Sequence, residues 1–151
     1  MKRDKKTLSV CMIVRDAEST IERAITSAKP IADEIVVVDT GSVDKTPGIL
    51  RSLGIEPIKH QWKDDFSEAR NLTLENAKGE WVLFLDADEY LPTDSHEKIL
   101  SAIDAPVDAY AVMIESEVKG QPGRTFINIF HRLFRKLPGV RFEGRIHEQV
   151  Y

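Results

Sequence analysis

Residues 81–89 read WVLFLDADE, a run of five apolar residues followed by four that include three carboxylates. An apolar run of this length is typical of a strand that is buried on both faces of a parallel sheet. Asp86 and Asp88 follow that strand directly, and in an extended segment side chains two residues apart point to the same side. A hard cation such as Mg²⁺ or Mn²⁺ takes one or two carboxylates and fills its other positions with water and substrate phosphate. The stretch therefore predicts a metal–diphosphate site at the end of a buried strand.

Outward from this stretch, the first ninety residues alternate short apolar runs with amphipathic segments. This alternation is the pattern of βαβ units, in which helices flank a mostly parallel sheet. Pro30 ends the first amphipathic segment, Gly54 ends the second, and Asp65 with Glu68 forms a capping pair for the third. We predict strands at 8–14, 35–38, 55–59 and 81–85 and helices at 17–28, 46–53, 65–77 and 94–103, with Thr46 and Asp94 as caps.

Beyond Pro106 the pattern changes, and two β-rich runs at 107–118 and 125–134 flank the turn sequence KGQPGR. Such a pair predicts an antiparallel hairpin or meander rather than another crossover. Because no repeat or linker-like segment interrupts the chain, residues 1–151 are predicted to form a single α/β domain. Its mostly parallel sheet is followed by a C-terminal β-rich segment.

The composition excludes several classes of protein. The 151 residues are 42% apolar and 30% charged, as in a globular domain, and 21 basic against 25 acidic side chains give a net charge of −4. No overall positive field attracts nucleic acid, so we expect no nucleic-acid partner. Neither an 18-residue apolar run nor a signal-peptide pattern occurs. We therefore expect a cytoplasmic protein without a transmembrane segment, and peripheral attachment at the inner face of the membrane stays open.

Several residues of reactive types are assigned to structural roles. Cys11, the single cysteine, lies in the apolar run LSVCMIV and is predicted to be a buried hydrophobe. Trp81 opens a buried strand and is predicted to pack in the core. The residues His60, His96 and His131 have no neighbouring chemistry in the sequence and are predicted to be structural or surface residues.

Polar and acidic side chains follow the predicted strands. Arg15, Asp16 and Glu18 come after the first strand, and Asp39 ends the second. Asp86, Asp88 and Glu89 follow the fourth. In open α/β sheets, ligands bind beyond the carboxyl ends of the parallel strands. These side chains are therefore expected to share one rim of the sheet, and that rim is the expected binding site.

Three other ligand-binding motifs are excluded. The segment DADEYLPTDSHE at 86–97 places Leu91 where a calcium-binding EF loop needs a glycine. The segment VRDAES at 14–19 has no glycine where a dinucleotide-binding fold needs G-x-G-x-x-G. A phosphate-binding G-x-x-x-x-G-K-[ST] loop is also missing from the sequence, so NAD enzymes and P-loop NTPases are excluded.

Four segments, LSVCMIVRDAE, ADEIVVVDTGSVDKT, FSEARN and GEWVLFLDADEYL, resemble in order and spacing the nucleotide-binding half of the family 2 inverting glycosyltransferases. The later sequences RLFR and FEGRIHE also resemble a bacterial branch of that family. The resemblance covers residues 7–92 and implies the Rossmann-like GT-A fold. It further implies that residues 7–92 form the nucleotide-sugar-binding half and that residues 105–151 begin the acceptor half. We expect that acceptor half to be truncated after Tyr151.

The resemblance also implies roles for individual residues and names the cofactors. Asp39 would accept the imide N–H of uracil, which is sensible because an ionised carboxylate can only accept hydrogen bonds. Asp86 would lie near the ribose and the metal, and Asp88 would be the principal ligand of Mn²⁺ or Mg²⁺. Arg70 would engage the base or a phosphate of a nucleotide-diphosphate sugar, and a UDP-sugar is the expected donor.

Four further residues are candidates for the same site. Asp16 would contact the nucleotide, although Arg15–Asp16 stands where the family commonly has Asn–Glu. Asp44 is either a nucleotide contact or a loop and capping residue. His147 is either a third metal ligand or an ordinary surface histidine. Glu148 is the candidate for the carboxylate base that deprotonates the acceptor.

The expected activity is the transfer of a sugar from the nucleotide to an acceptor hydroxyl, with inversion, in the synthesis of cell-surface glycans or glycoconjugates. The acceptor is a glycan, a lipid-linked molecule or a protein. Two alternatives remain open, a nucleotidyltransferase and a non-catalytic carbohydrate- or protein-binding module. A nucleotidyltransferase typically carries a phosphate loop rich in Gly, Lys and Arg after its first strand, and this sequence has none there.

Overall fold

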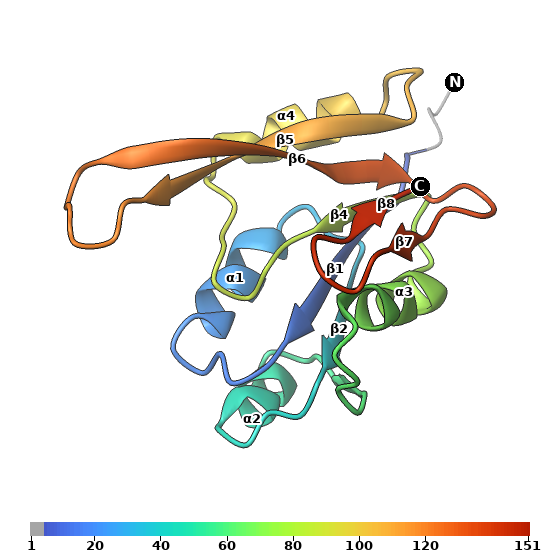
Figure 1. The fold of residues 1–151 in the computed structure, drawn as a ribbon. Coiled ribbons are helices and arrows are strands. Elements are labelled where there is room, and N and C mark those ends of the chain that lie inside the picture. Colours follow the sequence, from blue (N-terminus) through green and yellow to red (C-terminus); the bar gives the residue numbers. More distant parts are fainter. Residues whose placement is uncertain (1–4) are drawn as a thin grey trace.

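The structure is a computed structural model that describes residues 5–151, and residues 1–4 of the predicted domain lie outside the described residues. Figure 1 shows a central sheet with helices on both faces. The elements in chain order are β1 (Leu8–Val14), α1 (Ile21–Ala28), β2 (Glu34–Asp39), α2 (Thr46–Ser52), β3 (Ile58–Lys59), α3 (Phe66–Asn76), β4 (Trp81–Phe84), α4 (Ser95–Ala102), β5 (Ala109–Glu117), β6 (Thr125–Arg135), β7 (Phe142–Glu143) and β8 (Gln149–Val150).

The main sheet has the strand order β3-β2-β1-β4-β6-β5. Strands β3, β2, β1 and β4 are parallel, whereas β6 runs antiparallel to both β4 and β5. The predicted class, an α/β fold with a mostly parallel sheet and a C-terminal β-rich segment, is confirmed. The direction in which successive strands are added to the sheet changes at β1, because β2 lies on one side of β1 and β4 lies on the other.

The central strand β1 is buried on both faces. Val10 and Met12 belong to one apolar cluster with α1, α2 and the end of α4. Cys11 belongs to the other cluster, with residues of α3 and β7. Because side chains alternate across a strand, a strand covered on both faces must be apolar throughout, as LSVCMIV is. Trp81 is 1% exposed in the first cluster, so its predicted core role is confirmed.

The helix starts differ in part from the predicted caps. Asp65 accepts hydrogen bonds from the backbone N–H of Ser67 and Glu68, which confirms it as the cap of α3. The prediction that Thr46 caps α2 is wrong, because Thr46 is the first helical residue and its hydroxyl accepts from the Ala17 N–H at 2.8 Å. Asp94 precedes α4 but makes no side-chain capping bond.

Two element boundaries also differ. The predicted helix at 17–28 begins only at Ile21, because residues 18–20 form turns that lead from β1 into the helix. The predicted strand at 55–59 is reduced to Ile58–Lys59, which pairs with the last two residues of β2. Strand β3 is therefore a short edge strand beside the end of β2.

The predicted antiparallel hairpin is confirmed as β5 and β6, which pair from Ala109 with Phe134 to Glu117 with Thr125. Figure 1 shows this hairpin projecting past the rest of the sheet, while its other end lies beside β4. None of the helices that the structure describes is long and apolar enough to span a bilayer.

Gly79 allows the close approach of the α3–β4 turn to β1. A Cβ atom at this position would lie 2.6 Å from Ser9 Oγ and 2.7 Å from Ser9 N. We expect Gly79→Ala to lower the free energy of unfolding by about 1–3 kcal/mol, because the backbone must shift. Gly48→Ala in α2 is the control, since a Cβ there meets no atom within 4 Å and alanine favours helix. Chemical denaturation measures both, and equal stabilities would contradict the packing argument.

Burial makes the Cys11 thiol inert. Desolvation raises the pKa of Cys11 from its ordinary range to about 12. At about pH 8 the thiol therefore stays protonated, and only the thiolate attacks a disulfide reagent. We expect no labelling by such a reagent in the native protein and full labelling in guanidinium chloride. Rapid labelling of the native protein would show that β1 is accessible.

Candidate functional site

The carboxyl ends of the parallel strands form one rim. Val14 at the end of β1 pairs with Asp39 at the end of β2, and on the other side Cys11 pairs with Phe84 near the end of β4. The position between β1 and β4 is a topological switch point, where open α/β sheets characteristically bind ligands. The predicted shared rim is therefore present, and the loops after β1, β2 and β4 start from it.

The acidic segment after β4 is a closed turn. The Glu89 N–H donates to the Asp86 carbonyl at 3.0 Å, and the Asp86 N–H donates to Glu89 Oε2 at 2.8 Å. The prediction that Asp86 and Asp88 lie on an extended segment is therefore wrong, because backbone and side-chain bonds both close the turn. Asp86 is half-buried and Asp88 is exposed.

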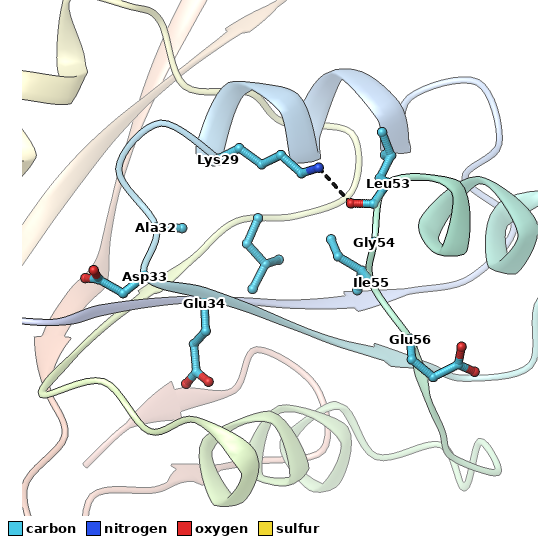
Figure 2. Close-up of a pocket in the computed structure, with 9 residues that line it drawn as sticks. Lys29, Ala32, Asp33, Glu34, Leu53, Gly54, Ile55 and Glu56 are labelled. Carbon is cyan, nitrogen blue, oxygen red and sulfur yellow. Dashed lines mark hydrogen bonds between the residues drawn. The ribbon is translucent and has the colours of Figure 1, made fainter.

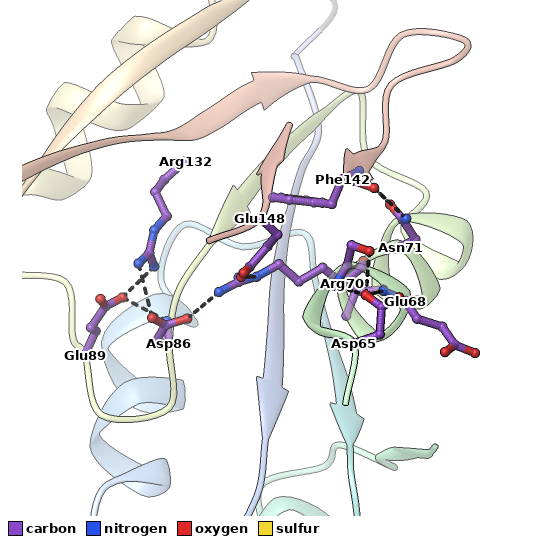
Figure 3. Close-up of polar contacts among 11 residues, drawn as sticks. Asp65, Glu68, Arg70, Asn71, Asp86, Glu89, Arg132, Phe142 and Glu148 are labelled. Carbon is purple, nitrogen blue, oxygen red and sulfur yellow. Dashed lines mark hydrogen bonds and ion pairs between the residues drawn. The ribbon is translucent and has the colours of Figure 1, made fainter. Parts of the chain in front are cut away.

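Two arginines from distant elements converge on Asp86 (Figure 3). Arg70 of α3 donates from Nη2 to Oδ1 at 3.3 Å, and Arg132 of β6 donates from Nη2 to Oδ2 at 3.1 Å. Arg132 also donates from Nη1 to Glu89 Oε2 at 2.9 Å, and Arg70 donates from Nε to Glu148 Oε1. Both guanidinium groups are nearly buried, with 11% and 13% of their side chains exposed.

Burial and charge act in opposite directions on Glu89. Desolvation and the neighbouring Asp86 carboxylate raise the pKa of Glu89, while the Arg132 guanidinium lowers it. The net direction is upward, as expected for a carboxyl group beside other carboxylates in a partly buried turn. The ion pair with Arg132 therefore opposes an unfavourable environment for the Glu89 charge.

The two carboxylate oxygens of Asp39 differ in their hydrogen bonds. The carboxylate is 4% exposed, and its Oδ1 accepts from the N–H of Gly41 at 2.9 Å and of Ser42 at 2.7 Å. Oδ2 is buried and has no hydrogen-bond partner among the described residues. Asp39 lines a cavity of about 490 Å³ whose other walls include Arg51 and Lys59. A buried acceptor without a partner is costly, so this oxygen fits a ligand N–H donor.

Asp16 and Asp44 tie two rim loops together. Asp16 Oδ1 accepts from the Val43 N–H at 2.8 Å, and Asp44 Oδ2 accepts from the Glu18 N–H at 3.1 Å. Asp44 Oδ1 also accepts from the Thr46 N–H at 2.9 Å. These bonds connect the loop after β1 to the loop after β2. Asp44 thus makes structural bonds in the loop, and the nucleotide contact that the sequence offers as the alternative stays a prediction.

The C-terminal segment is fixed to α3. The Asn71 side chain donates from Nδ2 to the Phe142 carbonyl at 2.9 Å and accepts from the Phe142 N–H at Oδ1 at 2.7 Å. The Phe66 N–H donates to the Arg145 carbonyl at 3.1 Å. Figure 3 shows that Glu148 of this segment lies beside Arg70. His147 is exposed and has a positive φ of 56°.

The structure brings some of the predicted site residues together and leaves others apart. Arg70, Asp86 and Glu148 form one connected ion network. Among residues 5–151, no three His, Cys, Asp or Glu side chains are grouped so that they could hold a metal ion by themselves. The predicted ligand set Asp86, Asp88 and His147 is thus not a preformed protein cage.

A second cavity, of about 300 Å³, lies near the amino ends of β2 and β3 (Figure 2). Asp33 and Glu34, at the start of β2, line it, and Lys29 donates to the Leu53 carbonyl at 2.7 Å across it. The Asp33 carboxylate is already used, because it accepts from the Leu8 N–H and pairs with Lys5. This cavity faces the amino ends of parallel strands, so the rim described above remains the candidate site.

The family model described as glycosyl transferase family 2 matches residues 9–147. This match covers the parallel strands, the rim and the hairpin. The chain belongs to glycosyl transferase family 2. The family resemblance predicted from the four sequence segments is therefore confirmed at the level of the family.

Relatives of this family 2 domain include longer proteins. A TPR repeat-containing protein of Synechococcus elongatus is 39% identical over 143 residues, which cover 95% of this chain and 35% of that protein. Glycosyltransferase SunS of Bacillus subtilis is 29% identical over 152 residues, covering 98% of this chain and 36% of that protein. The chain thus spans about a third of the length of these relatives.

Solved structures support the fold of this family 2 domain. TarS of S. aureus superposes with a TM-score of 0.65 at 21% identity, over 86% of this chain and 47% of that chain. Glucosyl-3-phosphoglycerate synthase of Mycobacterium tuberculosis, solved with Mn²⁺ and UDP-glucose, superposes with a TM-score of 0.52 at 28% identity. That match covers 60% of this chain and 36% of the synthase chain. The GT-A fold predicted from the resemblance is confirmed.

Sequence reasoning missed Arg132 as a site residue and gave Glu89 no role beyond its place among the acidic residues of the rim. Arg132 lies in RLFR, a segment used only to recognise the family, and nothing local to a β6 arginine indicates that it reaches the turn after β4. A signal for Glu89 existed, because it lies three residues after Asp86, the spacing at which a side chain can reach back to a backbone N–H.

The Asn71 amide holds β7 against α3, so its loss should free the C-terminal segment. We expect Asn71→Ala to lower the free energy of unfolding by about 1–3 kcal/mol, because the Phe142 N–H and carbonyl both lose their partner. Hydrogen exchange at residues 141–150 should accelerate by more than the global loss of stability explains. Asn76→Ala, which removes an exposed intrahelical bond, is the control and should change neither. Equal exchange in both variants would contradict this role.

Proposed function

We propose that this domain is a metal-dependent inverting glycosyltransferase of a bacterial branch of family 2, which moves a sugar from a UDP-sugar to an acceptor hydroxyl. One observation carries the proposal. The partnerless buried Oδ2 of Asp39 lies on the same rim as the acidic turn at Asp86–Glu89, so the rim offers an acceptor for a base and charged groups for a diphosphate. The complex of the mycobacterial synthase with Mn²⁺ and UDP-glucose supports this assignment.

The base-recognition part of the proposal rests on Asp39. Two backbone N–H groups fix Oδ1, so the carboxylate plane is held and Oδ2 is the oxygen left for the ligand. An ionised carboxylate is acceptor-only, and the N3–H of uracil is a donor. Asp16 and Asp44 remain proposed nucleotide contacts, and their bonds between the two rim loops hold the site's edge.

The donor set at the acidic turn fits a hard divalent cation only in part. Asp88 is exposed, whereas both oxygens of Asp86 accept from arginines. Mg²⁺ binds through one or two carboxylates plus substrate phosphates, so a complete protein cage is not needed. We propose Asp88, Asp86 and His147 as the residues that hold Mn²⁺ or Mg²⁺ together with the diphosphate. When bound there, the cation would stabilise the negative charge of the departing diphosphate.

The proposed acceptor base is Glu148. Its side chain pairs with Arg70, and a carboxylate group is able to accept a proton from an acceptor hydroxyl. Oε1 accepts from Arg70, which leaves Oε2 to face an acceptor hydroxyl. Arg70 also pairs with Asp86, so one guanidinium group orients the base relative to the donor side of the rim. Attack by the acceptor from the face opposite the diphosphate gives inversion.

Further expectations remain proposals. Residues 7–92 are proposed as the donor-binding half and residues 105–151 as the beginning of the acceptor half. We propose that the whole protein's acceptor is a glycan, a lipid-linked molecule or a protein, in the synthesis of cell-surface glycans or glycoconjugates. We also propose that the domain works in the cytoplasm or at the inner face of the membrane, without nucleic acid as a partner.

UDP should stabilise the domain only with the metal. At about 100 times its dissociation constant, a ligand specific for the folded state adds about 2.7 kcal/mol, which raises the unfolding midpoint by several degrees. We expect this shift with UDP and Mn²⁺ and its loss with EDTA or in Asp88→Ala. Asp104→Ala, which removes an exposed carboxylate outside the rim, is the matched control and should keep the shift. No shift with UDP, CDP, GDP or ADP would contradict the proposal.

Asp39→Asn should exchange the base preference from uracil to cytosine. The amide oxygen can keep the bonds from Gly41 and Ser42, which places an NH₂ donor where Oδ2 was. That donor opposes the N3–H of uracil and matches the N3 acceptor of cytosine. Calorimetry with Mn²⁺ should show UDP binding weakened at least about tenfold, with CDP binding gained relative to wild type. Equal losses for both nucleotides would contradict direct reading of the base by Asp39.

A further inference from the structure

Arg132 of β6 forms ion pairs with Asp86 and Glu89, two carboxylates that could otherwise bind a cation. Its Nη2 lies 3.1 Å from Asp86 Oδ2 and its Nη1 lies 2.9 Å from Glu89 Oε2. Nη1 and Nη2 therefore each donate to an oxygen that could otherwise serve as a metal ligand (Figure 3). Paired, charge-assisted bonds of this kind are among the strong hydrogen bonds of proteins.

The same arrangement is unfavourable for a bare cation. A divalent ion at Asp86 would lie beside a nearly buried guanidinium, which is 13% exposed and so little screened by solvent. An arginine side chain carries its positive charge at any ordinary pH. A cation can therefore gain Asp86 and Glu89 only if Arg132 moves away from them.

Arg132 has fewer close partners than Arg70. Arg70 pairs with Glu148 as well as Asp86, and its guanidinium lies 5.0 Å from the Phe84 ring centroid and 5.6 Å from that of Phe142. Arg132 has only the two carboxylates of the turn as salt-bridge partners among the described residues, with the ring of Phe130 at 5.4 Å. Phe130 is 48% exposed, so its ring contacts the Arg132 guanidinium group on one side without enclosing it.

We propose that Arg132 is a positioning residue that couples cation binding to diphosphate binding. With no nucleotide bound, Arg132 holds Asp86 and Glu89 and weakens binding of a bare divalent cation. A diphosphate offers the guanidinium a better bidentate partner, and its move to the phosphates releases both carboxylates. The inference rests on the proposed function, because it assumes that a nucleoside diphosphate binds at this rim.

The coupling has a thermodynamic consequence that does not depend on turnover. If the nucleotide raises the affinity for the cation by some factor, the cation raises the affinity for the nucleotide by the same factor. Arg132 should contribute part of that factor. Replacing Arg132 by an uncharged residue should therefore change the two affinities in opposite directions, whereas the loss of a merely structural residue should weaken both.

The test measures Mn²⁺ and UDP binding to the 151-residue chain separately and together. Free Mn²⁺ is followed by electron paramagnetic resonance and UDP by calorimetry, in wild type and Arg132→Met. We expect Arg132→Met to bind Mn²⁺ alone about tenfold more tightly and UDP with Mn²⁺ about tenfold more weakly, as for the loss of one close charge pair. Arg135→Met is the matched control, because Arg135 is on the same strand but pairs with Asp108 and lies opposite Trp81 at the start of β4.

The variant Arg132→Lys separates the effect of charge from that of geometry. It also replaces Arg132→Met as the test if the unfolding transition shows that Arg132→Met does not fold. Lysine keeps the positive charge but cannot bind two acceptors with a planar fork. We expect it to hold the affinity for Mn²⁺ alone near the wild-type value and to weaken UDP binding with Mn²⁺ severalfold. Unchanged UDP binding in Arg132→Lys would overturn the proposal.

The outcomes separate this inference from the proposed function. If wild type binds UDP with Mn²⁺ but folded Arg132→Met binds Mn²⁺ alone no more tightly, the coupling role of Arg132 is overturned and the proposed function stands. If wild type does not bind UDP with Mn²⁺ at all, the proposed function fails and this inference fails with it. An equal effect in Arg135→Met would show a nonspecific charge effect and would also overturn it.

Discussion

The carboxylate of Asp86 is the point at which the separate parts of the molecule are joined. Its two oxygens accept from Arg70 of α3 and Arg132 of β6, so a helix on one face of the sheet and a strand of the hairpin meet at the end of β4. A partly buried charge without partners is strongly unfavourable, which makes this meeting a constraint on the fold. Through Arg70 the constraint extends to Glu148 in the C-terminal segment.

The parallel sheet provides the rigid frame for this charged cluster. Strand β1 is buried on both faces and pairs with β2 and β4. The register of these pairs fixes where Asp39 and the acidic turn lie at the carboxyl ends of the strands. The turn is then closed by its own backbone and side-chain bonds, so Asp88 stays exposed while Asp86 faces the arginines. A rigid frame that carries short loops at one rim is the usual way in which α/β folds position ligand-binding groups.

Much of the parallel half could be predicted because its signals are local. A doubly buried strand must be apolar throughout, and Asp65 can cap α3 through bonds to residues two and three positions away. Other predictions failed where a distant partner decided the outcome. The Thr46 hydroxyl accepts from the Ala17 N–H across the rim rather than capping its own helix. Arg132 was missed as a site residue for the same reason.

The sequence alone determined the alternation of strands and helices, the buried character of Cys11 and Trp81, the membership of family 2 and the position of acidic residues after the strands. These properties depend on the periodicity of apolar residues and on the order of residues, both of which are visible in the sequence. Only the tertiary structure decided which charges face each other. Arg132 reaches Asp86 across 46 positions of sequence. The loop after β2 donates two backbone N–H groups to one oxygen of Asp39, while the other oxygen has no partner among residues 5–151. Such contacts depend on how the strands are ordered and paired in the sheet, and no local pattern encodes that order.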